Sequence, residues 1–295
     1  MTALPAALRL FAYSSAYSYI DLKGKQRDFM DLQKLLSLTR RCIDTYSLIE
    51  EGDHIAVGVS AGKDSLSLLV AMKALQRFYP KHFELSAITV DLGLGNIDLD
   101  PVRQLADDLG VPYHIVPTQI GEVLFDIRKE SNPCALCAKL RKGALDDKAL
   151  EIGANKIAYA HHKDDLIETA FLSMLYEGRF YSFSPLTYLD RTKLSVIRPF
   201  IFIDEADIIS FSKNYRGEGL PKQAVQEAQD RYANGLPVCK NPCPMDGYTR
   251  RQYVKELLHR IYQETPGADK RLFRAVIDGN IPGWPPANPN PRYNK

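Results

Sequence analysis

The chain has 295 residues and carries 38 Lys and Arg against 36 Asp and Glu, so its formal net charge is +2. Its hydrophobic content of 45% is enough for a large core, which excludes disordered and fibrous proteins. The net charge is too small to indicate a nucleic-acid partner through bulk electrostatics, so such a partner must be recognised by a local patch.

The cysteine count and the apolar runs indicate the compartment. Five cysteines are few for this length and odd in number, which argues against a disulfide framework and for a reducing environment. No apolar run reaches the roughly 18 residues that a membrane span needs. The first basic residue is Arg9, so the N-terminus lacks the basic-then-apolar order of a signal peptide. We therefore expect a soluble cytoplasmic protein without a membrane partner.

Short apolar runs alternate with helical stretches, which predicts βα units on a parallel sheet. An aromatic, Ser-rich extension covers residues 1–32, and an N-terminal helix that contains Cys42 follows it. Asp100 as N-cap, Pro101 and the terminal Gly110 frame one short helix. The expected strands cover 55–59, 85–90, 113–116, 156–160 and 194–197, and the other expected helices cover 64–78, 135–152 and 165–176, with one more from 204.

The strand signal ends at about residue 215, which divides the chain into three expected parts. The extension (1–32) is followed by a doubly wound α/β domain (33–215) and a C-terminal segment (216–295). In the C-terminal segment we expect a cysteine-bearing loop, a helix and a Pro-rich tail that contains Trp284, the only tryptophan; the loop covers 237–248 and the helix 249–264.

A polar, Gly-containing loop lies between the first expected strand and the helix after it. Backbone N–H groups and the positive helix end at such a turn favour a phosphate, and Lys63 adds a cation. The loop is not a Walker A loop, because Gly58 and Gly62 are one residue too close. An acidic side chain beside a phosphate suits Mg²⁺, so we expect Asp64 to hold this metal. The simpler alternative is an ordinary turn capped by Ser60.

The segment Val59–Ser65 resembles the SGGKDS loop of the N-type ATP pyrophosphatases, which cleave ATP between the α and β phosphates and release pyrophosphate. The resemblance implies ATP binding by Ser60, Ala61, Gly62, Lys63, Asp64 and Ser65. The family usually has Gly where this chain has Ala61, and an alanine is strained there if the position needs a positive φ.

Four cysteines fall into two pairs. Cys134 and Cys137 form a C-x-x-C pattern at the start of an expected helix, whose terminus lowers a thiol pKa. This pattern fits a redox pair, half of a zinc site or part of an iron–sulfur site. Cys239 and Cys243 in the later loop can supply one or two further ligands. Cys42 is interpreted as a buried small side chain.

A second polar segment follows an expected strand and opens a helix, which places it at the carboxyl edge of the sheet, where doubly wound folds bind ligands. This segment contains His161, His162, Asp164 and Asp165. Helix capping is the alternative role for either aspartate.

Three further polar residues are candidates for the same edge. Asp91 ends the second strand and is suited to a nucleotide or metal contact, with a loop-turn role as its alternative. Arg141, one turn past the C-x-x-C, and Arg198, after the last strand, are suited to steady a phosphate or a developing oxyanion. A solvated arginine is the alternative for each.

Over residues 33–262 the order and spacing of these segments resemble the tRNA 2-thiocytidine synthetase family; the matching segments are 134–143, 153–158, 161–165 and 196–199. In that family two C-x-x-C thiolates and one later cysteine hold a [4Fe–4S] cluster with one iron left open for sulfur. The resemblance implies Cys134 and Cys137 as ligands. We favour Cys243 as the third, because it keeps the spacing to the following helix, and Cys239 is the alternative.

The resemblance further implies a doubly wound sheet of the adenine-nucleotide alpha-hydrolase type and ATP-dependent tRNA thiolation. A base carbonyl, expected to be that of cytidine, is adenylated, and its oxygen is replaced by sulfur. The cofactors are then the [4Fe–4S] cluster, ATP and Mg²⁺. The partners are tRNA and a sulfur donor, either a cysteine desulfurase or inorganic sulfide, and a homodimer is an open question. The expected catalytic residues are Asp64, Arg141, Asp164 and Asp165, and those expected at ATP beside the loop are Asp91, His161 and Arg198.

The C-terminal segment has a local charge excess. Residues 250–274 contain seven basic and three acidic residues, a net charge of +4. The interleaved Tyr248, Tyr253 and Tyr262 suit RNA, which is bound through phosphate contacts and stacking. A solvated helix face explains the same pattern equally well.

Two rival functions remain open at this point. One keeps the phosphate loop in an enzyme that acts on another base or on a small molecule. The other is a nonenzymatic zinc or iron–sulfur module that uses ATP to regulate the binding of tRNA or protein. Release of pyrophosphate in the presence of tRNA separates an enzyme from a binding module.

Overall fold

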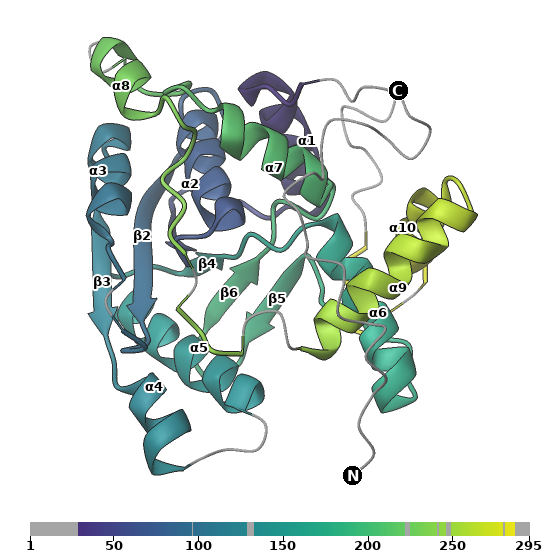
Figure 1. Ribbon diagram of the computed structural model, residues 1–295. Coiled ribbons are helices and arrows are strands. Elements are labelled where there is room, and N and C mark those ends of the chain that lie inside the picture. Colours follow the sequence, from purple (N-terminus) through teal and green to yellow (C-terminus); the bar gives the residue numbers. More distant parts are fainter. Residues whose placement is uncertain are drawn as a thin grey trace.

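The computed structural model describes residues 29–95, 97–128, 133–221, 225–240, 242–245, 249–279 and 281–286. A six-stranded sheet lies at its centre, with the strand order β3-β2-β1-β4-β6-β5 (Figure 1). All neighbouring strands pair in parallel except β5, which is antiparallel to β6. The strands are β1 Asp53–Gly58, β2 Phe83–Asp91, β3 Tyr113–Pro117, β4 Lys156–Ala158, β5 Leu186–Leu189 and β6 Leu194–Ile197.

Helices cover both faces of the sheet, so the predicted doubly wound α/β class is confirmed (Figure 1). The helices are α1 Leu32–Tyr46, α2 Lys63–Gln76, α3 Asp100–Leu109, α4 Ile120–Glu122, α5 Pro133–Glu151, α6 Lys163–Glu177, α7 Glu205–Asn214, α8 Val225–Arg231, α9 Arg250–Glu264 and α10 Ala268–Ile277, and a π-helical turn follows α4 at Val123–Ile127.

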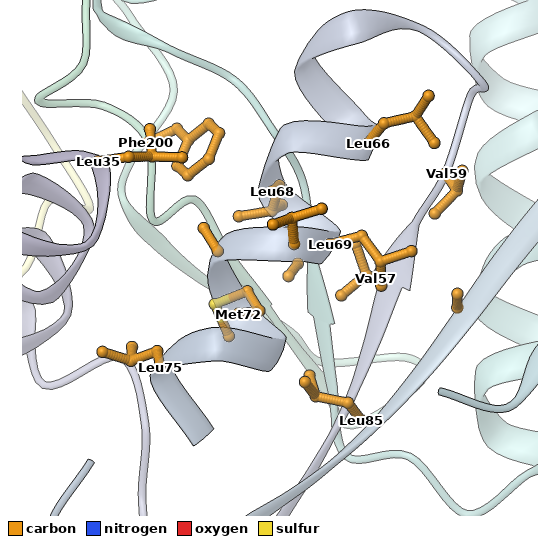
Figure 2. Close-up of a cluster of buried hydrophobic side chains, with 14 of the residues drawn as sticks. Leu35, Val57, Val59, Leu66, Leu68, Leu69, Met72, Leu75, Leu85 and Phe200 are labelled. Atoms are coloured by element: carbon orange, nitrogen blue, oxygen red, sulfur yellow. The ribbon is translucent and has the colours of Figure 1, made fainter. Parts of the chain in front are cut away.

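The alternation of side chains along β1 explains the two covered faces. Ile55 and Val57 belong to a large buried cluster with α2, whereas Ala56 points to the other face and packs with residues of α5. Figure 2 shows the side chains of α2 packed over Val57 and Leu85 of the sheet. The helix α2 is buried almost all round because α1 and α7 also pack on it. The first turn of α2 is therefore rigidly placed at the carboxyl edge of β1.

A group of C-terminal helices lies beside the sheet. The helices α9 and α10 both pack on α6 (Figure 1). The helix expected over 249–264 is α9, and Thr249 is its N-cap, since its hydroxyl accepts the N–H of Gln252 at 3.3 Å. The buried Lys163 at the start of α6 pairs with Asp204 at 2.8 Å and with Asp269 at 3.6 Å, which joins α6 to the starts of α7 and α10.

Some predicted features need correction. Leu99 rather than Asp100 is the N-cap of α3, and the N–H of Asp100 bonds to the Asp98 carboxylate at 3.0 Å. The prediction of Gly110 as the terminator of α3 is confirmed, since its φ is +63°. Two elements were not predicted: the four-residue edge strand β5, and the helix α10, which lies in the segment expected to be a tail.

Other predictions about the C-terminal part have mixed outcomes. Within the described residues no strand follows 215, as expected. Trp284 lies in the fold rather than in a loose tail, since its ring meets that of Tyr46 edge-on at 6.3 Å between centroids.

Cys42 is fully buried, as predicted. Most of the N-terminal extension, together with Tyr248, lies outside the described residues. No described helix has the length and apolarity that a membrane crossing requires.

Candidate active site

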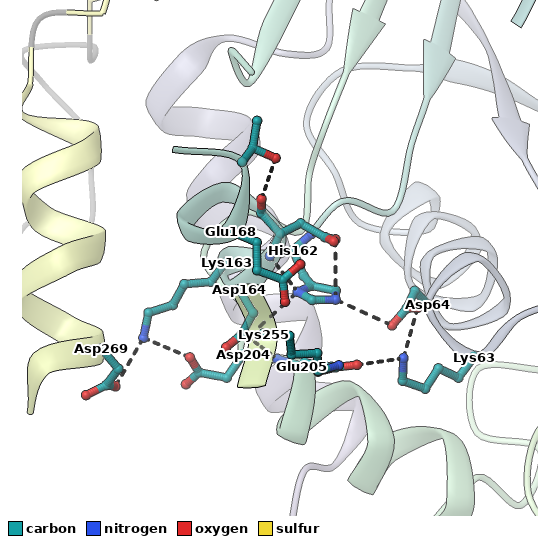
Figure 3. A network of polar contacts seen from close by, with 12 residues as sticks. Lys63, Asp64, His162, Lys163, Asp164, Glu168, Asp204, Glu205, Lys255 and Asp269 are labelled. Atoms are coloured by element: carbon teal, nitrogen blue, oxygen red, sulfur yellow. Dashed lines mark hydrogen bonds and ion pairs between the residues drawn. The ribbon is translucent and has the colours of Figure 1, made fainter. Parts of the chain in front are cut away.

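The phosphate loop and the second polar segment meet at the carboxyl edge of the sheet. The neighbouring parallel strands β1 and β4 end at this edge, and each leads into a helix, α2 or α6. As a result Nε2 of His162 lies 4.0 Å from Oδ1 of Asp64 (Figure 3). The structure therefore brings the two predicted segments into one site.

Hydrogen bonds to the Ser65 hydroxyl hold the phosphate loop in a conformation that gives Ala61 a positive φ. The N–H of Ser60 donates to Oγ of Ser65 at 3.1 Å, and this hydroxyl donates to the carbonyl of Gly62 at 3.0 Å. Ala61 has a φ of +59°, the left-handed region that favours glycine, so the predicted strain at this position is confirmed. The carbonyl of Ala61 accepts the N–H of Cys239 at 2.9 Å, which places the later cysteine loop directly on the phosphate loop.

Lys63 lies between two carboxylates. Its Nζ is 3.1 Å from Oδ2 of Asp64 and 3.2 Å from Oε1 of Glu205, and the other oxygen of Glu205 binds Lys255 at 2.6 Å (Figure 3). Burial alone would raise the pKa of Glu205, but Lys63 and Lys255 outweigh it and lower this pKa. Glu205 is not among the residues predicted for the site, because the acidic residues at this point of the sequence indicate only the start of a helix.

His162 is the N-cap of α6, and its acidic neighbours shift its pKa. Its Nδ1 accepts the N–H of Asp165 at 3.4 Å, while Oδ2 of Asp165 accepts the N–H of His162 at 3.1 Å. Burial disfavours the charged imidazole, but the carboxylates of Asp165, Asp164 and Asp64 together raise the pKa of His162. Oδ2 of Asp164 accepts the N–H of Glu205 at 2.7 Å. Both aspartates thus make the capping contacts that the sequence analysis held as their alternative role.

A buried carboxylate on α6 extends the site toward α9. Glu168 lies one turn after Asp165, and Nη1 of Arg251 donates to it at 3.0 Å and to Asp165 at 3.2 Å. Burial raises the pKa of Glu168 to about 7. Glu168 is not among the residues predicted for the site, although an acidic residue within an apolar helical stretch is a signal that could have indicated it.

These groups line one pocket of about 350 Å³ together with two of the predicted cysteines. The phosphate loop contributes Asp64, the start of α5 contributes Cys134, and the later loop contributes Cys243. The other described lining residues are His162, Asp165, Glu168, Glu205, Met245, Thr249, Arg251, Gln252 and Lys255. The phosphate loop and the cysteines therefore face the same space.

The cysteines differ in how they are engaged. Burial raises the pKa of Cys137, Arg141 opposes this rise, and the thiols of Cys243 and Cys134 add to it, so both of these thiols lie within electrostatic reach of Cys137. Sγ of Cys239 instead lies 3.2 Å from the carbonyl of Asp98. Among the described residues no three His, Cys, Asp or Glu side chains stand close enough to hold a metal ion.

The comparisons with known proteins identify the family. The family described as the PP-loop domain matches residues 32–218. The tRNA-cytidine(32) 2-sulfurtransferase of Pelobacter propionicus is 32% identical over 255 residues, which are 85% of this chain and 88% of that protein. The protein of the same name from Vibrio cholerae is 34% identical over 86% of this chain and 77% of its own length. The chain belongs to the tRNA-cytidine(32) 2-sulfurtransferase family.

A solved structure supports the same fold for this sulfurtransferase family member. The U34-tRNA thiolase NcsA from Methanococcus maripaludis, solved with its [4Fe-4S] cluster, matches with a TM-score of 0.65. The match covers 90% of this chain and 85% of that chain at 20% sequence identity. At this identity the likeness shows a common fold.

Four of the predicted residues are not among the described residues that line the pocket of this sulfurtransferase: Asp91, Arg141, His161 and Arg198. Asp91 has its loop-turn role, because its Oδ1 accepts the N–H of Gly93 at 3.0 Å. His161 stacks on Phe183 with 4.8 Å between centroids, and burial lowers the pKa of His161 to about 4. The guanidinium of Arg198 lies over the same ring, 5.1 Å from the Phe183 centroid, and burial lowers the pKa of Arg198 to about 10. Arg141 is exposed on α5.

Proposed function

We propose that this protein catalyses the ATP-dependent thiolation of a cytidine in tRNA. The observation that carries the proposal is the shared pocket, in which Asp64 of the phosphate loop faces Cys134 and Cys243. An enzyme that activates a base with ATP and then gives it sulfur needs both groups around the same base. The relatives named tRNA-cytidine(32) 2-sulfurtransferase support nucleotide 32 as the target.

The phosphate loop supplies the activation step. The oxygen of the base carbonyl forms a bond to the α phosphorus of ATP, and the bond from this phosphorus to the bridging oxygen breaks, so pyrophosphate leaves. Lys63 and the N–H groups at the start of α2 are placed to bind the charge that develops on the departing phosphates. Since Lys63 is paired with Glu205, phosphate binding replaces this ion pair.

Asp64 fits the role of a magnesium ligand. Its Oδ1 is buried and has no hydrogen-bond partner within the described part of the chain, while a hard carboxylate oxygen beside phosphates is what Mg²⁺ prefers. Bound there, Mg²⁺ would neutralise charge on the phosphates. The carboxylate of Asp64 is also one of the three that raise the pKa of His162, so the phosphate loop and the start of α6 are electrostatically coupled.

The second step replaces oxygen by sulfur at the activated carbon. A carbon–sulfur bond forms, the carbon–oxygen bond breaks, and AMP departs with the oxygen. Cys134, Cys137 and Cys243 are suited to hold a [4Fe–4S] cluster, because Cys134 and Cys243 line the pocket and both thiols lie within electrostatic reach of Cys137. Such a cluster would supply an iron without a protein ligand, at which sulfur can be carried. Cys239 is less suited, because its thiol faces the Asp98 carbonyl.

Further features of the protein remain proposals that rest on the sequence. The sulfur donor is a cysteine desulfurase or inorganic sulfide, and the protein acts in the cytoplasm. The chain consists of an N-terminal extension (1–32), the α/β domain (33–215) and a C-terminal segment (216–295). Assembly into a homodimer is a further question that sedimentation of the purified protein answers.

Nucleoside analysis tests the proposed function. The protein is reconstituted anaerobically with iron and sulfide and incubated with ATP, Mg²⁺, sulfide and total tRNA from a strain that lacks the enzyme. We expect 2-thiocytidine in the digested tRNA and pyrophosphate in solution. Pyrophosphate without a thionucleoside indicates an enzyme with another substrate, and ATP binding without pyrophosphate release indicates a binding module.

A further inference from the structure

Large apolar side chains are exposed together at the end of α6 and in the segment after it. Tyr176, Phe180 and Tyr181 expose 44%, 42% and 38% of their surface, and Met174 and Leu175 beside them are also exposed. Single exposed apolar residues are ordinary, whereas several large ones within one short stretch of the chain are typical of an interaction site.

Two arginines lie on these rings. The guanidinium of Arg250 is 4.6 Å from the centre of the Tyr176 ring, and that of Arg179 is 4.6 Å from the centre of the Tyr181 ring. Arg179 also pairs with Glu177 at 2.7 Å. Aromatic faces and guanidinium planes side by side are the groups on which unpaired RNA bases stack while the cations meet the phosphates. We call Tyr176, Arg179, Phe180, Tyr181 and Arg250 the aromatic surface.

The segment that carries the aromatic surface is held in one conformation. Gly178 ends α6 in the left-handed region, with a φ of +65°. Oγ of the buried Ser173 lies 3.0 Å from the carbonyl oxygen of Arg179 and 2.8 Å from that of Tyr181, and it accepts the N–H of Tyr181 at 3.0 Å. Rings presented by a fixed backbone lose little conformational entropy on binding.

Phe180 is also fixed from the other side. Its ring lies against Gly279 after α10, where an added Cβ would stand 2.6 Å from Cε1 of Phe180. The Phe180 ring therefore packs against the backbone after α10 on one side, while 42% of the residue's surface stays exposed.

The aromatic surface borders the candidate active site. Arg250 is the first residue of α9, and its two chain neighbours, Thr249 and Arg251, line the pocket. Along α6 the distance from Asp165 at the pocket to Tyr176 is roughly 16 Å at the usual helical rise. Nucleotides next to a base in the pocket therefore reach the aromatic surface.

We propose that the aromatic surface is the docking site for the single-stranded loop of the RNA substrate, with bases beside the target stacked on Tyr176, Phe180 and Tyr181. The proposal rests on the proposed function, which makes RNA the substrate. Charge complementarity supports it, because Arg179 and Arg250 lie on the rings and the adjoining residues 250–274 contain seven basic and three acidic residues, although Arg251 and Lys255 among them are paired with Glu168 and Glu205 at the pocket.

RNA binding by the full-length reconstituted protein tests the docking site without requiring turnover. The probe is a labelled stem–loop RNA with a cytidine at the position of tRNA nucleotide 32, and fluorescence anisotropy gives its Kd. We expect Tyr176→Ala, Phe180→Ala and Tyr181→Ala each to raise this Kd about tenfold, since one base–aromatic stack is worth this much. A double-stranded RNA of the same length offers no unpaired bases, so its Kd should differ less than twofold between these variants and the wild type.

Phe78→Ala is the matched control. Phe78 is 52% exposed and lies just past the end of α2 that points away from the phosphate loop, so its removal should leave the Kd of the stem–loop unchanged. Circular dichroism and the thermal midpoint of each variant show whether it is folded.

Three outcomes overturn the docking site or separate it from the proposed function. An unchanged stem–loop Kd in all three folded variants, while the wild type thiolates tRNA, overturns the docking site alone. A wild type that binds the stem–loop through these rings but forms no thionucleoside contradicts the proposed function alone. If Phe180→Ala converts a dimer into monomers in sedimentation and leaves the RNA Kd unchanged, the aromatic surface is an interface between two copies and the proposal is wrong.

Discussion

Nζ of Lys63 lies 3.2 Å from the carboxylate of Glu205, which ties the cation of the phosphate loop to the first turn of α7. The same carboxylate binds Lys255 of α9 at 2.6 Å. Glu205 therefore connects the phosphate loop with the helix that follows the cysteine loop, and an incoming phosphate competes with it for Lys63.

This competition predicts the effect of Glu205→Gln. The variant keeps the shape of the side chain but removes the charge that neutralises Lys63, so we expect a nonhydrolysable ATP analogue to bind about threefold to tenfold more tightly. Isothermal titration calorimetry gives the two dissociation constants. Asp204→Asn, which removes a partner of Lys163 instead, is the control, and weaker binding by Glu205→Gln would refute the competition.

The cysteines give a prediction with an internal control. We expect Cys134→Ser, Cys137→Ser and Cys243→Ser to lose the visible absorbance and most of the iron after anaerobic reconstitution. Cys239→Ser should keep both, because the Cys239 thiol faces the Asp98 carbonyl rather than the pocket. If Cys239→Ser loses the cluster and Cys243→Ser retains it, Cys239 and not Cys243 is the third ligand. A wild type that is colourless and contains zinc would exclude the cluster.

Glu168 predicts a pH-dependent stability. Its folded pKa of about 7 lies above the ordinary value of 4.5, so the folded state binds the proton more tightly than the unfolded state does. Its contribution is therefore complete below about pH 4.5 and is lost as the pH rises toward 7 and beyond, by at most about 3 kcal/mol. The charged groups that face Glu168 are Asp165, Arg251 and Lys255.

Urea unfolding at several pH values between 5 and 8 measures this contribution. The free energy of unfolding of Glu168→Gln should fall less over this range than that of the wild type, since the glutamine stays neutral. Glu264→Gln, at an exposed position of α9, should follow the wild type. Equal pH slopes for Glu168→Gln and the wild type would contradict the raised pKa.

Arg251 predicts a coupling between α6 and α9. Arg251→Ala leaves the Glu168 carboxylate buried without its cation, so we expect a loss of about 2–3 kcal/mol in the free energy of unfolding at pH 8. The double variant Arg251→Ala with Glu168→Gln should recover part of this loss, because the Glu168 charge is gone, whereas Asp165 still lacks its contact with Arg251. Fully additive losses in this cycle would show that the two residues do not interact.

The sequence predicted the elements whose patterns are local. The apolar run before Ser60 and the polar loop after it required only a strand followed by a helix N-terminus, and Gly110 ended a helix by its own conformational freedom. The pair of Cys134 and Cys137 was visible from spacing alone, whereas its proximity to Cys243 depends on the tertiary fold.

The residues that the sequence analysis missed depend on contacts between distant segments. Glu205 reaches the phosphate loop only because α7 packs on α2, and Glu168 becomes part of the site only because Arg251 of α9 comes over it. Asp91 and Arg198 follow strands as predicted, yet local hydrogen bonds hold Asp91 in its own loop, and aromatic packing holds Arg198 beside Phe183.

The most direct test of a shared site for ATP and sulfur is the ratio of pyrophosphate released to 2-thiocytidine formed in one reaction with tRNA. We predict one pyrophosphate for each 2-thiocytidine in the wild type and loss of both products in Asp64→Asn. Pyrophosphate released in the presence of tRNA without any 2-thiocytidine would contradict the proposal that the phosphate loop and the cysteines act on the same base.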